Sequence, residues 1–494
     1  MIAQAKRWQA RLSSRTSYGV LLLAFILAAF LRFWEIGSRP GYDWDEPVYA
    51  NLVGNIAQHH TLVIKAQYGT KAQPWLFHPP FHFLLVGQWF KLAGTGIVQA
   101  RVWGASMSLV AMVLLFFALK AMVGSKQAFR TTALLSIDAW MVYANRVSSI
   151  ENTLLVFIVL AIWFYWRAMQ QPTATRFVVA GMLVGAVTLY KFTGAYILIA
   201  VLINWFIQRQ RRLNRQHLLL VATTFAVVVL YCIAMTFFFW KSGNDFFWKD
   251  NADQLQRTLA LHGSRGKASN TLAMVTPLVH QYRVFVGTIL VAVSSTVLVA
   301  VRLIQCFRAR SWERVKKNSV LFSWVLASIL SFGSIGLKFP TYFQLLLVPM
   351  YVYLVVELGE IIGRRNSTKD QQRRWLVNVG AAVLVLLSLL GFKWRIVDHH
   401  DNAIKQTQHY AETQIPANAV ILAEEAIGTI VPQQYCNIYR AEACQNVVSY
   451  IITYKTDQHP IPSNPAFSRL LGHSTEVQVY TGFKETITIW RVNR

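Results

Sequence analysis

Long apolar runs recur along most of the chain and restrict what it can fold into. Each run is near the minimum length with which a helix crosses about 30 Å of hydrocarbon. The shortest pair, 177–190 and 192–208, could also be one kinked hairpin. The sequence predicts a polytopic α-helical membrane protein with about eleven spans. We place them at residues 17–34, 99–123, 128–144, 149–168, 177–190, 192–208, 217–240, 282–305, 319–336, 340–358 and 375–393.

The charged residues support this class and set an orientation. Of the 494 residues, 54% are hydrophobic and only 14% are charged, whereas about a quarter of a soluble domain is charged. The net charge of +26 could indicate nucleic-acid binding, but basic residues also mark the cytoplasmic loops of membrane proteins. Four basic segments fall on one side of the predicted spans: "AKRWQARLSSR", "RQRRLNRQH", "RARSWERVKKN" and "GRRNSTKDQQRR". We therefore expect a cytoplasmic N-terminus, no nucleic-acid partner, and a plasma membrane or an endoplasmic-reticulum-type membrane.

This orientation leaves three larger segments outside the cytoplasm. The first is the loop 35–98, and the second is the loop 241–281, in which we find no motif. The third is the chain after Lys393, whose segments "AVILAEEA", "VSYIITYKT" and "ETITIWRV" are typical of strands. We expect a transmembrane module at 1–395 and a small extracytoplasmic α/β domain at 396–494.

The four cysteines divide between these two parts. Cys436 and Cys444 lie in the outer domain with seven residues between them, so that a disulfide and two free thiols are both open. Cys232 and Cys306 fall in or at the ends of separate spans, where small buried apolar residues are expected.

The first outer loop carries three carboxylates within four residues, Asp43, Asp45 and Glu46, in "GYDWDEPVYANLV". The following stretch, "DEPVYANLVGNIAQHH", has apolar residues near a helical period. Further on, "FHPPFHFLLVGQWFKLAG" is apolar for about ten residues, which is too short to span. We predict that both stretches are helices along the outer surface, with the three acids at the membrane–water boundary.

Other ionisable residues are predicted to face the same side. Arg146 and Glu151 bracket an outer turn in "NRVSSIEN", Asp138 lies in the span before it, and Lys191 lies at the outer tip of "LVGAVTLYKFTGAYILIA". Ionisable side chains at membrane depth are costly and by default mark sites or pathways. The alternatives are that the acidic triplet is a surface turn, with Asp45 capping the next helix, and that the other residues form ion pairs that only hold the bundle together.

Carboxylates beside basic groups suit the transfer of a group from a phosphate to a hydroxyl. A general base activates the hydroxyl, and cations hold the charge of the departing phosphate. The sequence has no GxxxxGK[ST] loop, no HExxH motif and no dinucleotide fingerprint. It therefore lacks a visible means of using a soluble nucleotide, whereas a phosphate presented by a lipid in the outer leaflet would need none.

Several motifs in order along residues 18–360 resemble one family. "WDEPVYA" is similar to the DExxYA or DExxFG motif in the first external loop of protein O-mannosyltransferases and lipid A aminoarabinose transferases. "FHPPFHFLL" resembles the HPP segment of the mannosyltransferases, and "ARVWGASMSLVAMV" their arginine-led second span. "NRVSSIENTLLVF", "LVGAVTLYKFTGAYIL" and "LKFPTYFQLLLVPMYVYL" resemble later family segments. The ordered set is identified with the polyprenyl-phosphate-sugar-using branch of the glycosyltransferase-C superfamily.

This resemblance implies an inverting transfer of a sugar from a polyprenyl or dolichyl phosphate to an acceptor hydroxyl outside the cytosol. It implies that Asp45 is the catalytic base and Glu46 its acidic neighbour. Arg101 and Arg146 would hold the phosphate or shape the site. Glu151 takes the place of a second acid that shares a metal with the first in some members. Because Asp45 and Glu151 supply only part of the oxygen shell of Mg²⁺ or Mn²⁺, we expect either no required cofactor or one divalent metal.

The sequence departs from the family pattern around its cations. His78 stands where the aminoarabinose transferases have a lysine, and His82 lies in the region of a missing mannosyltransferase lysine. Thr341 replaces the usual arginine before Tyr342, which leaves Lys338 as the nearby cation. The histidines could rebuild part of a phosphate clamp or be interface anchors. The candidate substrate-binding residues are Asp43, His78, His82, Arg101, Arg146, Glu151, Lys191, Lys338 and Tyr342.

Two other functions are compatible with part of the pattern. A transporter or flippase for a polyprenyl-linked sugar would also need ionisable residues in the membrane, but we find no inverted repeat of the kind that transporters often show. A structural anchor for the outer domain would leave the loop carboxylates unused. The expected partners of the transferase are a polyprenyl-phosphate-linked sugar, the bilayer, and an acceptor that is a protein, a lipid or a glycan.

Overall fold

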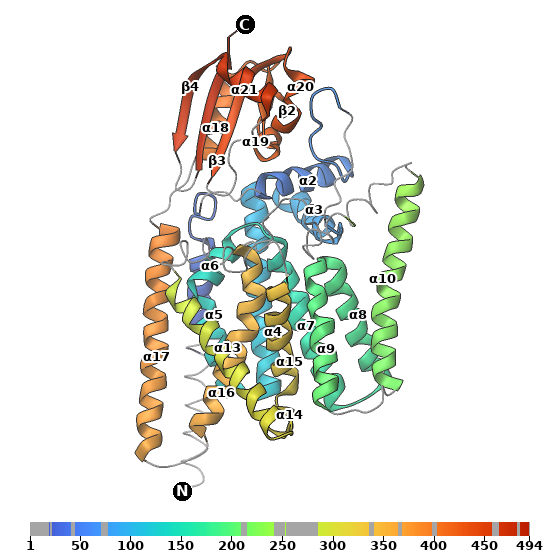
Figure 1. Cartoon of the computed structure of the whole chain (residues 1–494), viewed down its shortest axis with the longest axis vertical. Coiled ribbons are helices and arrows are strands. Elements are labelled where there is room, and N and C mark those ends of the chain that lie inside the picture. Colours follow the sequence, from blue (N-terminus) through green and yellow to red (C-terminus); the bar gives the residue numbers. More distant parts are fainter. Residues whose placement is uncertain are drawn as a thin grey trace. The chain divides into compact units, whose positions relative to one another are not determined.

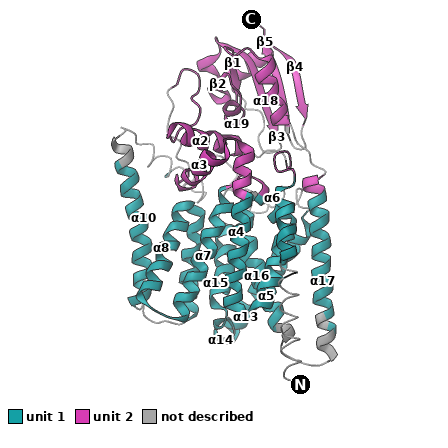
Figure 2. Ribbon diagram, turned by 180° about the vertical axis from the view of Figure 1, so that it is seen from behind, with its two compact units in different colours: residues 1–34, 105–145, 150–393 teal, residues 35–104, 146–149, 394–494 magenta. Residues whose placement is uncertain are grey.

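A computed structural model of the chain separates into two compact units, coloured in Figure 2. Unit 1 contains residues 1–34, 105–145 and 150–393, and unit 2 contains residues 35–104, 146–149 and 394–494. The structure describes residues 19, 22–40, 45–70, 78–208, 215–241, 252, 285–334, 340–363, 368–397, 403–456, 464–481 and 485–493. The predicted site residues Asp43 and Lys338 lie outside these ranges, as does nearly all of the loop 241–281.

Unit 1 is a bundle of helices that run up and down in Figure 1. Their long apolar stretches need partners or lipid on every side, which favours a bundle. A first helix covers Leu22–Phe33. The others are α4 (Ile97–Val123, which begins in unit 2), α5 (Ser125–Ile137), α6 (Ala139–Arg146), α7 (Ile150–Gln170), α8 (Ala174–Tyr190), η1 (Phe192–Ala195), α9 (Tyr196–Ile207), α10 (Arg215–Lys241), α13 (Val286–Arg308), α14 (Glu313–Lys316), α15 (Ser319–Ser334), η2 (Pro340–Tyr342), α16 (Phe343–Gly363) and α17 (Thr368–Phe392). The π-helical turn Lys393–Val397 follows α17 and lies mostly in unit 2.

The apolar helices confirm a multi-pass membrane architecture. Among the described residues, six helices are long and apolar enough to cross a membrane. Four more predicted spans correspond to apolar helices of 10–17 residues, and the eleventh, 128–144, falls on the pair α5 and α6. The predicted count of eleven spans therefore remains unconfirmed, although each predicted range coincides with helix. Helices α10 and α17 lie at opposite edges of unit 1 (Figure 1) and bury little of their apolar surface, as expected for helices facing lipid.

A buried carboxylate explains the break between α5 and α6. Asp138 interrupts the helix with an extended ψ of 126°, and its Oδ1 accepts a hydrogen bond from the backbone N–H of Met141 at 2.9 Å. Its Oδ2 accepts hydrogen bonds from Thr288 Oγ1 at 2.7 Å and Tyr351 Oη at 2.6 Å. On the other side of the break, Arg32 donates to the carbonyl of Ser136 at 2.8 Å. These contacts satisfy backbone groups that an interrupted helix leaves without partners.

A second polar cluster lies deep in unit 1 and joins helices far apart in sequence. Arg32 Nε and Nη2 donate to Asn145 Oδ1 at 3.2 and 3.0 Å. The Asn145 amide donates to Asn152 Oδ1 and to Gln344 Oε1, both at 2.9 Å. All four side chains are fully buried. Because unpaired polar groups are costly in such surroundings, the cluster fixes how these helices pack.

Unit 2 combines helices of the loop 35–98 with an α/β domain. The loop forms α2 (Asp45–His59) and α3 (Phe81–Ala93), which pack against each other and confirm that both predicted stretches are helical. The domain has a five-stranded sheet of order β2-β1-β3-β5-β4. Its elements are α18 (Ala403–Gln414), β1 (Val420–Ala423), α19 (Glu425–Ile430), β2 (Gln434–Asn437), η4 (Ile438–Arg440), α20 (Ala441–Cys444), β3 (Val448–Thr456), α21 (Pro465–Gly472), β4 (Ser474–Thr481) and β5 (Glu485–Val492).

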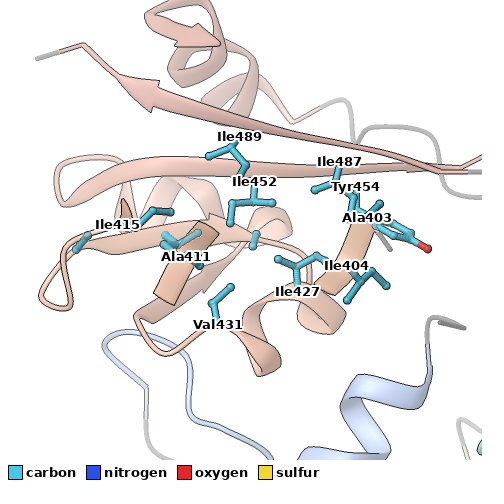
Figure 3. Packing of buried hydrophobic residues seen from close by; sticks show 13 residues of the cluster. Ala403, Ile404, Ala411, Ile415, Ile427, Val431, Ile452, Tyr454, Ile487 and Ile489 are labelled. Carbon is cyan, nitrogen blue, oxygen red and sulfur yellow. The ribbon is translucent and has the colours of Figure 1, made fainter. Parts of the chain in front are cut away.

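Each face of this sheet is covered by its own apolar core. Figure 3 shows one core, in which Ile404 of α18 and Ile427 of α19 lie beside sheet residues such as Ile452 and Ile487. The other core lies under α20 and α21 and includes Leu422 from β1. Strand β1 is buried on both faces because successive side chains enter opposite cores.

A disulfide joins Cys436 of β2 to Cys444 of α20 on the second face of the sheet. This outcome settles the choice between a disulfide and two thiols that the sequence left open. Cys306 is a buried free cysteine, as expected, and Cys232 is partly buried.

Candidate functional site

The first residue of α2 carries the exposed carboxylate of the acidic motif. Asp45 lies in the first turn, where the helix dipole favours negative charge, and its side chain is exposed. Tyr49, one turn later, donates from Oη to Asp45 Oδ2 at 3.4 Å. His78 Nε2 lies 3.2 Å from the same Tyr49 hydroxyl. The structure therefore links His78, Tyr49 and Asp45 in one polar chain.

The neighbouring acid has the opposite environment. Glu46 is fully buried and forms a two-pronged ion pair with Arg101 of α4, with Oε1–Nε and Oε2–Nη2 distances of 2.7 and 2.6 Å. Glu46 Oε1 also accepts a hydrogen bond from the backbone N–H of Ser148 at 2.6 Å. Such a pair combines charge with fixed geometry, and it holds the start of α2 in place.

Both predicted arginines bind the segment that precedes the acidic motif. Arg101 Nη1 donates to the carbonyls of Ile36 and Pro40 at 3.0 and 2.9 Å. Arg146 donates from Nε and Nη2 to the carbonyl of Arg39, at 3.1 and 2.8 Å. The guanidinium groups therefore shape residues 36–40, which lead into the motif.

Aromatic contacts hold the two histidines of the predicted site, His78 and His82. Tyr49 lies edge-on to Phe83, with 5.4 Å between ring centroids, and edge-on to His78, at 6.2 Å. The imidazole of His82 is buried and lies 5.2 Å from the ring of Phe83. His78 is also buried. These contacts join α2 and α3 around the polar chain that ends at Asp45.

Unit 1 contains the remaining predicted site residues that the structure describes. Lys191 ends α8 in an extended conformation and forms an ion pair with Glu151 of α7. Its Nζ also lies 4.2 Å from the centre of the Tyr342 ring, within the range of a cation–π contact. The predicted ion-pair alternative thus accounts for the Lys191–Glu151 contact.

A pocket in unit 1 begins at Tyr342. It lies among η1, α9, α15, η2 and the start of α16. Its wall combines hydroxyl groups with apolar side chains, which is the composition expected where a polar headgroup meets an apolar chain. The lining residues are Thr193, Tyr196, Ser328, Ser331, Phe332, Tyr342, Leu345 and Leu346.

The described residues do not supply an obvious metal centre. No group of three or more histidine, cysteine, aspartate or glutamate residues gathers among them. Of the two predicted ligands, Glu151 forms an ion pair with Lys191, and Asp45 is the first residue of α2. A hard divalent ion takes six or more oxygen ligands, so neither residue alone defines a site for such an ion, and we derive no step through one.

Sequence reasoning missed contributors that the structure places at the motif. Tyr49 is the tyrosine of "DEPVYA", and its position one turn after Asp45 is a sequence signal for its contact with that residue. The two glutamates of "AVILAEEA" lie at the end of a predicted strand, and the strand pattern assigns them no role. No sequence signal pointed to Ser148, because its contribution is a backbone N–H.

Comparison with known proteins supports the same family. Residues 77–235 match the family model described as dolichyl-phosphate-mannose-protein mannosyltransferase. The predicted resemblance is confirmed. No curated protein sequence matches the chain.

Solved structures share the fold across nearly the whole chain. ArnT from Cupriavidus metallidurans, bound to undecaprenyl phosphate, superposes with a TM-score of 0.63 and 15% identity, covering 95% of this chain and 98% of that one. The archaeal oligosaccharyltransferase AglB from Archaeoglobus fulgidus, in complex with an inhibitory peptide and a dolichol-phosphate, has a TM-score of 0.57 and 12% identity, covering 89% and 69%. A complex of that oligosaccharyltransferase with zinc and sulfate has a TM-score of 0.57 and 12% identity, covering 88% and 67%.

Proposed function

We propose that this membrane protein is a glycosyltransferase that moves a sugar from a polyprenyl or dolichyl phosphate to an acceptor hydroxyl on the extracytoplasmic side, with inversion at the sugar carbon. The family match and the fold shared with ArnT and AglB support transfer from a lipid-linked donor. The side of the membrane, the inversion and the residue roles are our inference.

The arrangement of Asp45 and Glu46 carries the proposal. A general base must be open to the acceptor and yet held in a fixed orientation. Asp45 is exposed and contacts the Tyr49 hydroxyl, while the next residue, Glu46, is clamped to Arg101 inside the protein. An acidic surface turn with no functional role would need neither the buried ion pair of Glu46 with Arg101 nor the polar chain to His78.

In the proposed reaction the acceptor hydroxyl loses its proton to Asp45 as its oxygen attacks C1 of the donor sugar. The new C1–O bond forms on the face opposite the phosphate, which accounts for the inversion. The bond between C1 and the phosphate oxygen breaks, and its electron pair stays on the polyprenyl phosphate that leaves. No redox partner or nucleotide is required.

We assign the donor phosphate to the cationic side chains. Lys191 supplies a charge beside Tyr342, which also lines the pocket whose wall combines hydroxyl groups with apolar side chains. Lys338, four residues before Tyr342, is proposed as a further cation. His78 and His82 would add positive charge when protonated. Arg101 and Arg146 act as positioning residues, because their observed contacts are with Glu46 and with backbone carbonyls.

The positive loops and the disulfide support the proposed extracytoplasmic location. Basic residues concentrate in cytoplasmic loops, and on that rule the loop 35–98 and the α/β domain would lie outside. The Cys436–Cys444 bond supports this side, because disulfides persist mainly in oxidising compartments.

Transfer of radiolabel by the purified full chain tests the proposal. The chain is placed in phosphatidylcholine nanodiscs with a mixture of polyprenyl-phosphate [¹⁴C]sugars and membrane extract as the acceptor source. We expect label to leave the lipid only when the chain is active, and we expect EDTA to have little effect. Label taken from a nucleotide sugar without lipid would contradict the proposed donor. In a parallel assay with the chain in sealed phosphatidylcholine vesicles, movement of the donor across the bilayer with no transfer would instead identify a flippase.

A further inference from the structure

Two adjacent glutamates follow β1 in the α/β domain. Strand β1 ends at Ala423, Glu424 comes next, and Glu425 is the first residue of α19. Strand β1 pairs in parallel with β2 on one side and with β3 on the other. The glutamates therefore lie at the carboxyl end of a strand in the parallel part of the sheet.

The chain connections make the carboxyl end of β1 a topological switch point. Helix α19, between β1 and β2, contributes Ile427 to the core on one face of the sheet. Helix α20, between β2 and β3, contributes Ala441 to the core on the other face. Open α/β sheets bind ligands at the carboxyl ends of strands where the connections pass to opposite faces. The position of Glu424 and Glu425 meets that condition.

The helix that follows β1, α19, packs beside the acidic motif within unit 2. Helix α19 packs against α2, and the side-chain amide of Asn51 in α2 donates to the carbonyl of Thr429 in α19 at 3.4 Å. The carboxylates of Glu425 and Asp45, each the first residue of its helix, are close enough to interact electrostatically. Burial raises the pKa of the Glu425 carboxyl, and the charge of Asp45 raises it further.

A half-buried lysine, Lys65, fixes α19 in this position. Lys65 Nζ donates to the carbonyls of Gly428, Val431 and Gln433, the first and last at 3.2 and 2.7 Å. Its backbone N–H donates to Asn51 Oδ1 at 2.8 Å. The external loop is thus tied both to α2 and to the end of α19, so the placement of Glu425 beside Asp45 is built into unit 2.

Glu424 gives independent support for ligand binding at the carboxyl end of β1. Its side chain is buried, with 2% exposure, yet its Oε2 has no hydrogen-bond partner in the structure. A buried carboxyl oxygen without a donor is costly. A hydrogen-bond donor arriving at the edge of β1 would remove that cost, whereas an anion would add to it.

We propose that the carboxyl end of β1 is the acceptor subsite, in which Glu425 accepts a hydrogen bond from a hydroxyl of a neutral sugar next to the attacking hydroxyl. The acceptor role rests on the proposed function. Carboxylates accept hydrogen bonds from sugar hydroxyls, and the neighbouring carboxylates of Glu425 and Asp45 disfavour a phosphate-bearing acceptor. The specificity for a neutral, hydroxyl-rich acceptor is thereby supplied by the α/β domain.

Binding of simple sugars to the full chain in nanodiscs tests this subsite. The probes are methyl α-glucoside, which is neutral, and glucose 6-phosphate, which is anionic; binding is measured by NMR titration. We expect Glu425→Ala to bind the glucoside about tenfold or more weakly, as for loss of a hydrogen bond to a charged group. Glu425→Gln keeps an acceptor oxygen and should lose less. Glu442→Gln, an exposed glutamate on α20, is the matched control and should bind as the wild type does.

Undecaprenyl phosphate binding, measured on the same samples, separates the two proposals. Normal binding of this lipid together with unchanged glucoside affinity in Glu425→Ala would overturn the subsite alone. Tighter binding of glucose 6-phosphate than of the glucoside by the wild type would overturn the neutral-acceptor specificity. A wild-type chain that fails to bind undecaprenyl phosphate would contradict the proposed function and, with it, the acceptor role.

Discussion

Two adjacent acids in one helical turn differ in burial, and we infer that they differ in role. Asp45 is exposed, whereas Glu46 is fully buried against Arg101. Asp45→Asn should therefore fold normally and lose about 10²–10⁴-fold in transfer rate, the usual contribution of a general base. Asp43→Asn, outside the described residues, should have the mildest effect. Rates measured with the labelled donor check this order, and a normal rate in Asp45→Asn would move the base elsewhere.

The corresponding substitution Glu46→Gln should lower the stability of the folded protein. Glu46→Gln leaves the Arg101 guanidinium buried without its counter-charge, which typically costs about 3–5 kcal/mol. We expect a lowered thermal unfolding midpoint in nanodiscs, with Asp45→Asn on the same turn as a control that unfolds like the wild type. If Glu46→Gln unfolds normally and loses only rate, Glu46 takes part in the chemistry directly.

Glu424 predicts a pH dependence of stability. Burial raises the pKa of its carboxyl from 4.5 to about 7, so the folded state binds this proton more tightly than the unfolded state does. The resulting stabilisation is complete below about pH 4.5 and is lost as the pH rises through about 7. Glu424→Gln should therefore gain stability relative to the wild type over that interval, in chemical unfolding followed by fluorescence. Equal pH profiles for the two proteins would show that Glu424 is not buried as a neutral acid.

The sequence predicted the acidic residues of the site but could not distinguish the exposed acid from the buried, paired one. The motif placed Asp45 and Glu46 side by side, and only the fold brings Arg101, 55 positions later, against one of them. Similarly, the ionisable residues at the membrane boundary were recognised by their cost in lipid, but that cost does not say which partner satisfies it. The ion pair of Lys191 with Glu151 and the closeness of the Glu425 and Asp45 carboxylates depend on tertiary packing, which leaves no local pattern.

At the scale of elements, the break between α5 and α6 changes how Asp138 is understood. The sequence suggested a site residue, whereas the structure gives its carboxylate three hydrogen bonds that hold the interrupted helix. Asp138→Ala should lose these bonds and unfold at a clearly lower temperature, because each buried donor left unpaired costs about 1–3 kcal/mol. Asp138→Asn keeps an acceptor for Met141 and should stay folded with most of its transfer activity. A folded but inactive Asp138→Asn would restore the site assignment.

The sheet shows which elements a sequence reveals. The apolar patterns of β1, β3 and β5 predicted three strands correctly. Strand β4 was not predicted because its side chains are mostly exposed, and β2 was not predicted because it has only four residues. The order of the strands, and with it the switch point at β1, follows from long-range pairing that no local periodicity encodes.

At the scale of the whole molecule, the predicted topology connects every other assignment. If the basic loops lie inside, the acidic motif and the α/β domain share the outer side, where a lipid-linked donor is available and a soluble nucleotide sugar is not. The disulfide between Cys436 and Cys444 agrees with that side. A reversed orientation would expose the motif to the cytosol and remove the reason for a lipid donor.

Cysteine labelling in intact cells decides the orientation. In a background without Cys232 and Cys306, we expect Thr70→Cys in the external loop and Glu476→Cys on β4 to react with a membrane-impermeant maleimide, because both positions are exposed. Lys317→Cys, exposed in a basic loop, should react only after the membrane is permeabilised. The parent protein should stay unlabelled, since Cys436 and Cys444 are joined. Labelling of Lys317→Cys alone in intact cells would invert the topology, and with it the proposed outer active site.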